Sequence, residues 1–334
     1  MARIDNLNNF LTDVAEAIRT KKETTDLISP NIFDTEIAGI ETGGGDLSEY
    51  FTESITYGTS NQSGWEATII KTPAYKFSGN NCSYMFKNYP CRNLDLSKIN
   101  TSNVTNMSNM FLYADNLIEL DVSNFNTSKV TDMSAMFYSC TNLIELDVSN
   151  FNTSNVTNMN NMFSYSGKLT DLDVSNFDVS KVTNVSGMFG NCSSLTSVIL
   201  NKFNATKLTT ANAMFNNCSA IKTIDISSLD FSLFNGVQNS VWALFTACTS
   251  LENLIFANNL GKGYTASANY SYAQLKLDEC KKLTHDSLID VMNKLYDLTA
   301  NGKNTQKLIL GTTNIEKLTQ EEIAIATNKG WTVS

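Results

Sequence analysis

A repeat of about 26 residues runs through the middle of the 334-residue chain and constrains its fold more than any other feature. Each copy carries a phenylalanine that follows a methionine or a leucine, and successive phenylalanines are 25, 26, 26, 26, 26 and 30 residues apart. They are Phe86, Phe111, Phe137, Phe163, Phe189, Phe215 and Phe245. One unit of this length cannot bury its apolar side chains alone, so we expect the copies to stack and share one continuous core.

The first half of each unit predicts a short β-strand. It holds three apolar residues in the pattern of Leu117, Leu120 and Val122. In an extended chain successive side chains alternate between faces, so Leu120 and Val122 point inward while Glu119 and Asp121 point out. Copies laid side by side, roughly 4.8 Å apart, would form a parallel sheet about 30 Å across for seven copies.

The second half of each unit predicts a return segment that fills the core from the other side. Val130, Met133, Met136 and Phe137 are three or four residues apart or adjacent, which is typical of a short helical or 3₁₀ turn. Most cysteines, such as Cys140, follow the phenylalanine by three residues, where other copies have alanine or serine. We therefore favour small buried positions over a redox or metal role for these cysteines.

The whole pattern predicts an α/β repeat solenoid, a leucine-rich-repeat-like stack with a parallel β-sheet, a small N-terminal helical anchor and an α/β C-terminal cap. The expected parts are a helical attachment segment (1–45), a β-rich N-terminal cap (46–81), leucine-rich repeats of about 26 residues (82–260) and an α/β C-terminal cap (261–334).

The C-terminal part is expected to alternate strands and helices. A helix should run from about Thr284 to Leu298, and a capping box at 319–322 should open a second helix that stops near Gly330. Short strands are expected around 275–277, 308–310 and 331–333.

Composition excludes several functions. With 24 Lys+Arg and 33 Asp+Glu, the net charge of −9 argues against a nucleic-acid partner. No run of 18 apolar residues is present, so we expect no membrane insertion. The first residues lack a basic stretch followed by an apolar one, so we expect no export by the usual route and free thiols. A disulfide between Cys82 and Cys91 is the alternative that this argument disfavours.

No constellation of catalytic residues is present in the sequence. The single histidine, His285, stands at the start of a predicted helix beside Asp286, and a surface role is favoured over catalysis. The recurring carboxylate pairs lack a distinct partner for glycoside hydrolysis. We therefore expect no enzyme activity, no catalytic residue, no metal and no cofactor.

The outward positions of the predicted strands form the candidate ligand-binding surface, on the concave face of the solenoid. They are Glu119, Asp121, Glu145, Asp147, Asp171, Asp173, Ser197, Thr223 and Asp225. One interpretation is a strip that binds a ligand or a cation. The other, which we favour for the aspartates, is structural, with the carboxylates accepting hydrogen bonds from nearby turn amides. Tyr113, Tyr138 and Tyr165, on the return side, are a second candidate surface.

The repeat pattern, Leu-x-x-Leu-x-Val followed by Phe-x-x-Cys, resembles the leucine-rich repeats of BspA-like bacterial surface proteins over residues 82–256. An extra Thr-Ser-x-Val-Thr-x-Met stretch in each copy departs from the shorter family unit and is similar to its Met-Phe variant. The resemblance implies adhesion and recognition through a solenoid, and no enzyme activity.

The N-terminal segment has a different pattern. Leu7, Leu11, Val14 and Ile18 form one stripe of a predicted helix, which either docks on its own domain or serves assembly. Residues 7–22, LNNFLTDVAEAIRTKK, resemble the attachment segment of tail and baseplate proteins from phages of Gram-positive bacteria. This resemblance implies an anchor that joins a virion or a phage-tail-like particle. A homotrimer is an expectation by analogy with tail fibres alone.

Two hypotheses follow. The first is a receptor-binding, tail-fibre-like protein of a phage or phage-tail-like particle, assembled in the host cytoplasm, which contacts tail or baseplate proteins and binds a bacterial surface polysaccharide or protein. The alternative is a bacterial cell-surface adhesin with the same repeats.

Overall fold

The computed structural model describes residues 80–89, 92, 94, 96, 99–200, 203, 205–234, 241, 243–263 and 274–334. The attachment segment expected at 1–45, with its stripe of Leu7, Leu11, Val14 and Ile18, lies outside the described residues. So do almost all of the N-terminal cap expected at 46–81 and one partner, Cys91, of the disfavoured disulfide.

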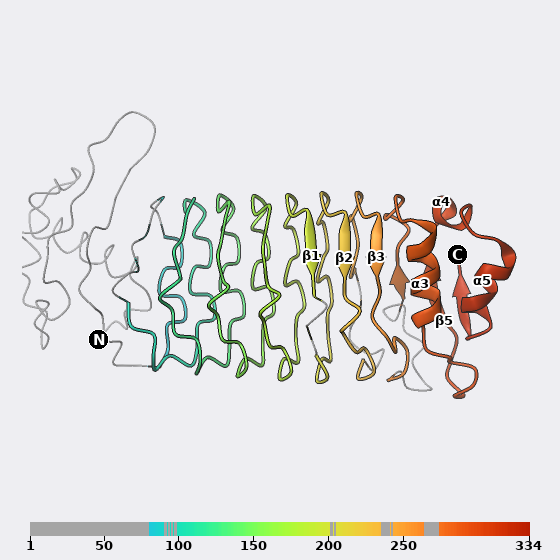
Figure 1. Cartoon of the computed structure of the whole chain (residues 1–334), viewed down its shortest axis with the longest axis horizontal. Helices are drawn as coiled ribbons and strands as arrows, with labels where there is room; N and C mark the ends of the chain where they lie inside the picture. Colours follow the sequence, from blue (N-terminus) through green and yellow to red (C-terminus); the bar gives the residue numbers. More distant parts are fainter. Residues whose placement is uncertain are drawn as a thin grey trace, which may run out of the picture.

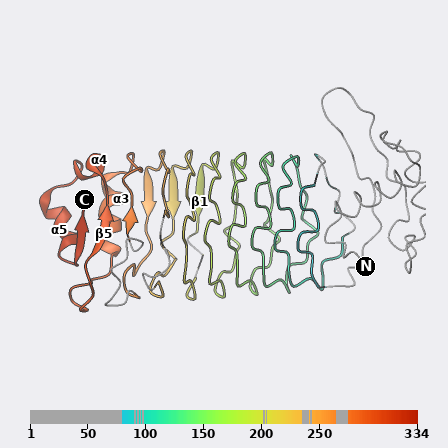
Figure 2. The ribbon, with the colours of Figure 1, turned by 180° about the vertical axis from the view of Figure 1, so that it is seen from behind.

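Successive repeat units lie side by side in a row, and the helices gather at the C-terminal end of that row (Figures 1 and 2). Parallel bridges join each unit to the next between residues 25 or 26 positions apart in the sequence. One series of bridges runs Asn81, Asn106, Asp132, Asn158, Asn184 and Thr210. The 26-residue period of the sequence is therefore the register in which the units meet.

The core is a set of columns in which equivalent apolar side chains of successive units touch. The seven phenylalanines that mark the repeat stack with ring centroids 5.4 to 5.9 Å apart and rings within 10° of parallel. The apolar positions of the first half, such as Leu117, Leu120 and Val122, are buried as expected. The stacking contact lies along the row, so each phenylalanine in the middle of the array supports two neighbours.

Regular parallel strands appear in three units only among the residues that the structure describes. They are β1 (Ser197–Ile199), β2 (Thr223–Asp225) and β3 (Asn253–Ile255), in the order β1-β2-β3. Earlier described units show one isolated bridge on this side, between Glu145 and Asp171. The parallel pairing is as predicted, but the described sheet is narrower than the seven copies we expected.

The narrower sheet coincides with acidic outward residues, although the one bridge among the earlier described units joins two of them, Glu145 and Asp171. Glu119, Glu145 and Asp171 occupy the position that Ser197, Thr223 and Asn253 occupy in β1, β2 and β3. Like charges directly opposite one another destabilise strand pairing, whereas neutral residues do not. The strands become regular where the acidic residues end.

The return half of each unit is a chain of turns closed by bonds between residues three apart, as in the 3₁₀ alternative that we expected, and the described residues form no continuous helix there. Ala135 and Ser139 have left-handed backbones, with φ of 51° and 58°. The Met136 amide donates back to the Met133 carbonyl within the unit (3.3 Å), whereas the Phe137 amide donates to Met162 of the next unit (2.9 Å). Some backbone amides thus close the turns within a unit, and others bond to the next unit. An α-helix could not join units in this way, because its backbone hydrogen bonds are all internal.

In Figures 1 and 2 the units follow one another along a nearly straight line in the plane of the view. Curvature of a repeat array follows from a small rotation at each repeat. Here the strand side and the return side are both joined from unit to unit by backbone hydrogen bonds, as in Ile144 to Ile118 and Phe137 to Met162. Both sides therefore advance by nearly the same distance per unit.

The C-terminal part forms a second parallel sheet, in the order β4-β5-β6, with three helices. The elements are β4 (Leu275–Lys276), α3 (His285–Lys294), β5 (Gln306–Ile309), α4 (Thr312–Ile315), α5 (Gln320–Thr327) and β6 (Trp331–Val333). The capping box of Thr319 and Glu322 is confirmed. Helix α3 is shorter than expected because the backbone turns extended at Leu295, and the four-residue helix α4 was not predicted.

Helix α3 closes the open edge of β3. Ser287 accepts from the Leu254 amide (2.9 Å), Asp290 accepts from the Phe256 amide (2.8 Å), and Lys294 donates to the Phe256 carbonyl (3.0 Å). These three side chains, three and four residues apart, lie on one side of the helix. They take the place of a further strand at three of the backbone groups on this edge of β3.

Candidate functional site

The predicted ligand-binding positions all lie on the strand side of the row. Glu119, Asp121, Glu145, Asp147, Asp171, Asp173 and Ser197 are exposed, whereas Thr223 and Asp225 are half-buried. We call these nine residues the strand face. The alternation of inward and outward side chains is as predicted, so the side chains of this face can vary without changing the core.

The aspartates of the strand face have a structural role. Asp121, Asp147, Asp173 and Asp225 each accept a hydrogen bond from the backbone amide of the serine two residues later, as in Asp121 with Ser123 (2.9 Å) and Asp173 with Ser175 (2.8 Å). Bonds from both the side chain and the amide of Ser149 hold the pKa of Asp147 below its usual value. The turn-amide bonds that we expected on the structural interpretation are therefore present.

Glu119, Glu145 and Asp171 remain as the acidic side chains of the strand face that do not cap such turns. Asp171 accepts a bond from the Thr170 hydroxyl (3.3 Å), and the three residues lie in successive units. Within the described ranges, no group of three or more histidine, cysteine, aspartate or glutamate side chains is arranged to hold a metal ion.

Tyr113, Tyr138 and Tyr165 form a second surface, which we call the tyrosine strip. Their ring centroids are 5.6 Å apart between Tyr113 and Tyr138, and 5.2 Å apart between Tyr138 and Tyr165. Tyr113 is 44% exposed and Tyr165 is 48% exposed. Burial and the two neighbouring phenols raise the pKa of Tyr138. The sequence placed these tyrosines on the return side, and the structure brings them into contact.

Polar side chains follow the tyrosine strip in the sequence and are joined to one another across units. Ser139 donates to the Asp115 carboxylate (3.2 Å), Asn142 donates to the Asp115 carbonyl (2.6 Å), and Lys168 donates to the Asn142 side chain (2.7 Å). Sequence analysis missed this row. The available signal was that Asn142 and Lys168 are 26 residues apart and so occupy one repeat position.

The cysteines of the repeats are buried and belong to the core. The thiols of Cys140, Cys192, Cys218, Cys248 and Cys280 each donate to the carbonyl of a phenylalanine in the preceding unit. In the unit that has serine, the Ser166 hydroxyl makes the same bond to Phe137 (2.8 Å). Burial raises the pKa of the Cys192 thiol to about 12, which disfavours the thiolate form.

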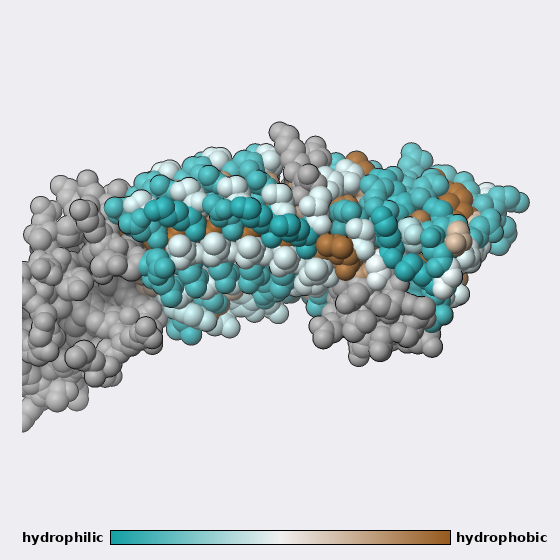
Figure 3. All heavy atoms as spheres, turned by 90° about the horizontal axis from the view of Figure 1, so that it is seen from below, coloured by the Kyte–Doolittle hydropathy of each residue, from teal (hydrophilic) through white to brown (hydrophobic). Residues whose placement is uncertain are grey.

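The described surface seen in Figure 3 is mostly hydrophilic, with a few small hydrophobic areas towards the C-terminal half. Exposed large apolar side chains other than tyrosines are few among the described residues: Ile144, Leu233 and Ile255. No helix in the described part of the chain has the length and apolar character needed to cross a membrane. The tyrosine strip is therefore the most concentrated aromatic feature of the described surface.

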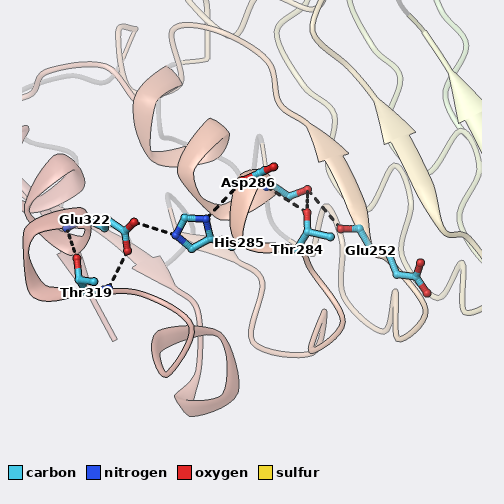
Figure 4. A network of polar contacts seen from close by, with 7 residues as sticks. Glu252, Thr284, His285, Asp286, Thr319 and Glu322 are labelled. Atoms are coloured by element: carbon cyan, nitrogen blue, oxygen red, sulfur yellow. Dashed lines mark hydrogen bonds and ion pairs between the residues drawn. The ribbon is translucent and has the colours of Figure 1, made fainter.

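His285 takes part in a polar network that joins two helices (Figure 4). Its Nε2 atom lies 2.8 Å from the Glu322 carboxylate, which also accepts from the Thr319 amide at the start of α5. Its Nδ1 atom lies 3.4 Å from Asp286. The hydrogen bond to Glu322, and then that to Asp286, raise the pKa of His285 above its usual value. The arrangement ties α3 to α5.

We expect the C-terminal part to lose stability as pH rises. A pKa raised in the folded state means that protonated His285 stabilises the fold below its ordinary pKa of about 6.5, and that this contribution disappears as pH rises through the raised value. Melting temperatures at about pH 6 and about pH 8 should therefore differ more for the wild-type chain than for His285→Gln. If the melting temperatures of the two proteins changed equally between these pH values, the contact between His285 and Glu322 would not contribute to stability.

These observations define a class of protein, one built from repeats that stack in register, with a constant interior and outward positions that vary from copy to copy. The family described as "Mycoplasma protein of unknown function, DUF285" matches residues 80–193, 116–229 and 167–276. Together these matches cover more than half of the sequence, and the chain belongs to this family.

No curated protein matches the chain. The family match supports the resemblance to BspA-like repeat proteins and favours the bacterial-surface alternative. It gives no support to the resemblance between the N-terminal segment and phage tail proteins, nor to the phage receptor-binding hypothesis that we placed first.

Proposed function

We propose that the chain is a non-enzymatic bacterial surface adhesin whose leucine-rich-repeat-like solenoid binds a ligand through its outward side chains. The observation that carries this proposal is the contrast between the two sides of each unit. Inward positions hold the same apolar types in copy after copy, whereas the outward position of Glu119 becomes Glu145, Asp171, Ser197 and Thr223 along the row. A rigid core with variable outward positions is the usual design of repeat proteins that recognise other molecules.

Charge reversal on the strand face tests the proposal. We expect Glu119→Lys with Glu145→Lys to weaken binding of the labelled full chain to cells by about ten-fold, which corresponds to about 1.4 kcal/mol. Both side chains are exposed, so the melting temperature should change little. The matched control is Glu316→Lys with Glu321→Lys, which makes the same charge change on exposed residues of the C-terminal part. If the two variants bound cells equally well, the binding site would lie outside the strand face.

The place where the protein is found distinguishes the proposed adhesin from the phage tail protein of the alternative hypothesis. An adhesin should be labelled by antibody on intact producing cells and removed by protease added outside them. A tail protein should instead copurify with particles. Recovery of the chain in particles, with none on the cell surface, would contradict the proposed function.

A further inference from the structure

The tyrosine strip carries aromatic residues at positions where the backbone disfavours them. Tyr113 and Tyr165 have left-handed backbones, with φ of 60° and 63°. The same position in other units, also left-handed, holds Asn88, Ser139, Asn191, Asn217 and Ala247. Asparagine tolerates this conformation, whereas a bulky residue is strained there. The fold does not need tyrosine at these two places, so the rings serve something other than folding.

The strip also has the chemistry of a carbohydrate site. Aromatic rings stack on the C–H faces of sugars, and side-chain carboxylates, amides and hydroxyls bond to sugar hydroxyl groups. Here three rings are followed by a linked polar row of Asp115, Ser139, Asn142 and Lys168. Within the described residues, no hydrogen bond engages the phenol hydroxyls of Tyr113 and Tyr165, which leaves them available to a ligand.

The distances between the rings and the net charge of the chain restrict the class of ligand further. Ring centroids 5.6 and 5.2 Å apart, from three successive units, repeat on the scale of one sugar in an extended glycan. The rings are turned by 87° and 47° relative to one another, so each ring would contact a different sugar and the three do not form one flat platform. A net charge of −9 disfavours a polyanion.

We propose that the tyrosine strip binds a neutral, extended, β-1,4-linked polysaccharide that runs along the row of repeats. This inference rests on the proposed function and adds to the strand face a second contact surface, with its own ligand class. It places the aromatic contact on the return side, with the polar row beside it supplying hydrogen bonds.

Calorimetric titration of the full chain with cellohexaose and with chitohexaose tests the inference. We expect at least one of these neutral hexasaccharides to bind, and Tyr113→Asn with Tyr165→Asn to weaken that binding at least ten-fold. Asparagine is the residue that other units use at this position, so the melting temperature should stay equal or rise. The matched control is Tyr84→Asn, which replaces another exposed, left-handed tyrosine outside the strip and should bind as the wild type does.

Three results would overturn the inference. They are binding of neither hexasaccharide, equal binding by the double variant, or a double variant that loses thermal stability together with binding. Preference for the anionic polymer hyaluronan, used as a third probe, would also contradict it. If the double variant still binds cells normally, the tyrosine inference fails and the adhesin proposal stands. If the wild-type chain binds no cells at all, the adhesin proposal itself fails.

Discussion

We expect Phe163→Ala to lower the free energy of unfolding by about 3–5 kcal/mol, the usual cost of removing a buried aromatic side chain. Phe163 is fully buried and stacks on both sides, with ring centroids 5.7 Å from Phe137 and 5.9 Å from Phe189. Its loss therefore leaves a cavity that two neighbouring units share. Because repeat arrays are stabilised mainly by contacts between neighbours, the array should divide at this point.

Urea unfolding of the full chain measures this loss. The control is Phe163→Leu, which keeps most of the apolar volume and should cost clearly less than the alanine variant. Native-state hydrogen exchange should show faster exchange in the units around residue 163 than near the C-terminus. A loss below about 1 kcal/mol for Phe163→Ala would mean that the aromatic column does not hold the units together.

The second large effect concerns Asn314 in helix α4. Its side-chain amide is buried and donates to three backbone carbonyls, those of Leu277 (3.0 Å), Cys280 (3.3 Å) and Leu310 (3.1 Å). We expect Asn314→Leu to cost about 3 kcal/mol or more, because each buried polar group left without a partner costs about 1–3 kcal/mol. Leu277 directly follows β4, Cys280 lies in the turn after it and Leu310 directly follows β5, so the C-terminal sheet should loosen first.

Circular dichroism during urea unfolding measures the cost. Asn301→Leu is the matched control, because Asn301 is exposed and donates one bond, to the Asp297 carbonyl. A surface change of this kind usually alters stability by less than about 0.5 kcal/mol. If the two leucine variants unfolded at the same urea concentration, the three hydrogen bonds of Asn314 would contribute no more to the free energy of unfolding than the single bond of Asn301.

The parts of the fold that depend on period could be predicted from the sequence. A period of 26 residues, with apolar side chains at fixed places such as Leu120 and Phe137, was enough to indicate parallel register and a shared core. The capping box of Thr319 and Glu322 was visible because it depends on neighbouring residues alone.

Other features depend on contacts between units and escaped prediction. Spacings of three and four around Met133 and Met136 suit a helix as well as a series of turns, and the choice depends on hydrogen bonds to the next copy. Closure of the β3 edge by Ser287, Asp290 and Lys294 joins residues more than 30 positions apart. For the candidate site, the outward direction of Glu119 was predictable from alternation, whereas the ring contacts of Tyr138 were not, since it stands one position away from the other two tyrosines in the repeat.

The near-equal advance of the two sides of each unit has a consequence for how such a chain could change in evolution. Inserting or deleting one 26-residue copy would move the C-terminal end along the row by one unit, since every copy meets the next in the same register. Copy number would then act as a length adjustment, in steps of about 5 Å, the spacing of neighbouring strands. If the chain is the surface adhesin that we propose, related chains with different copy numbers would hold the C-terminal part at different distances from the first repeat.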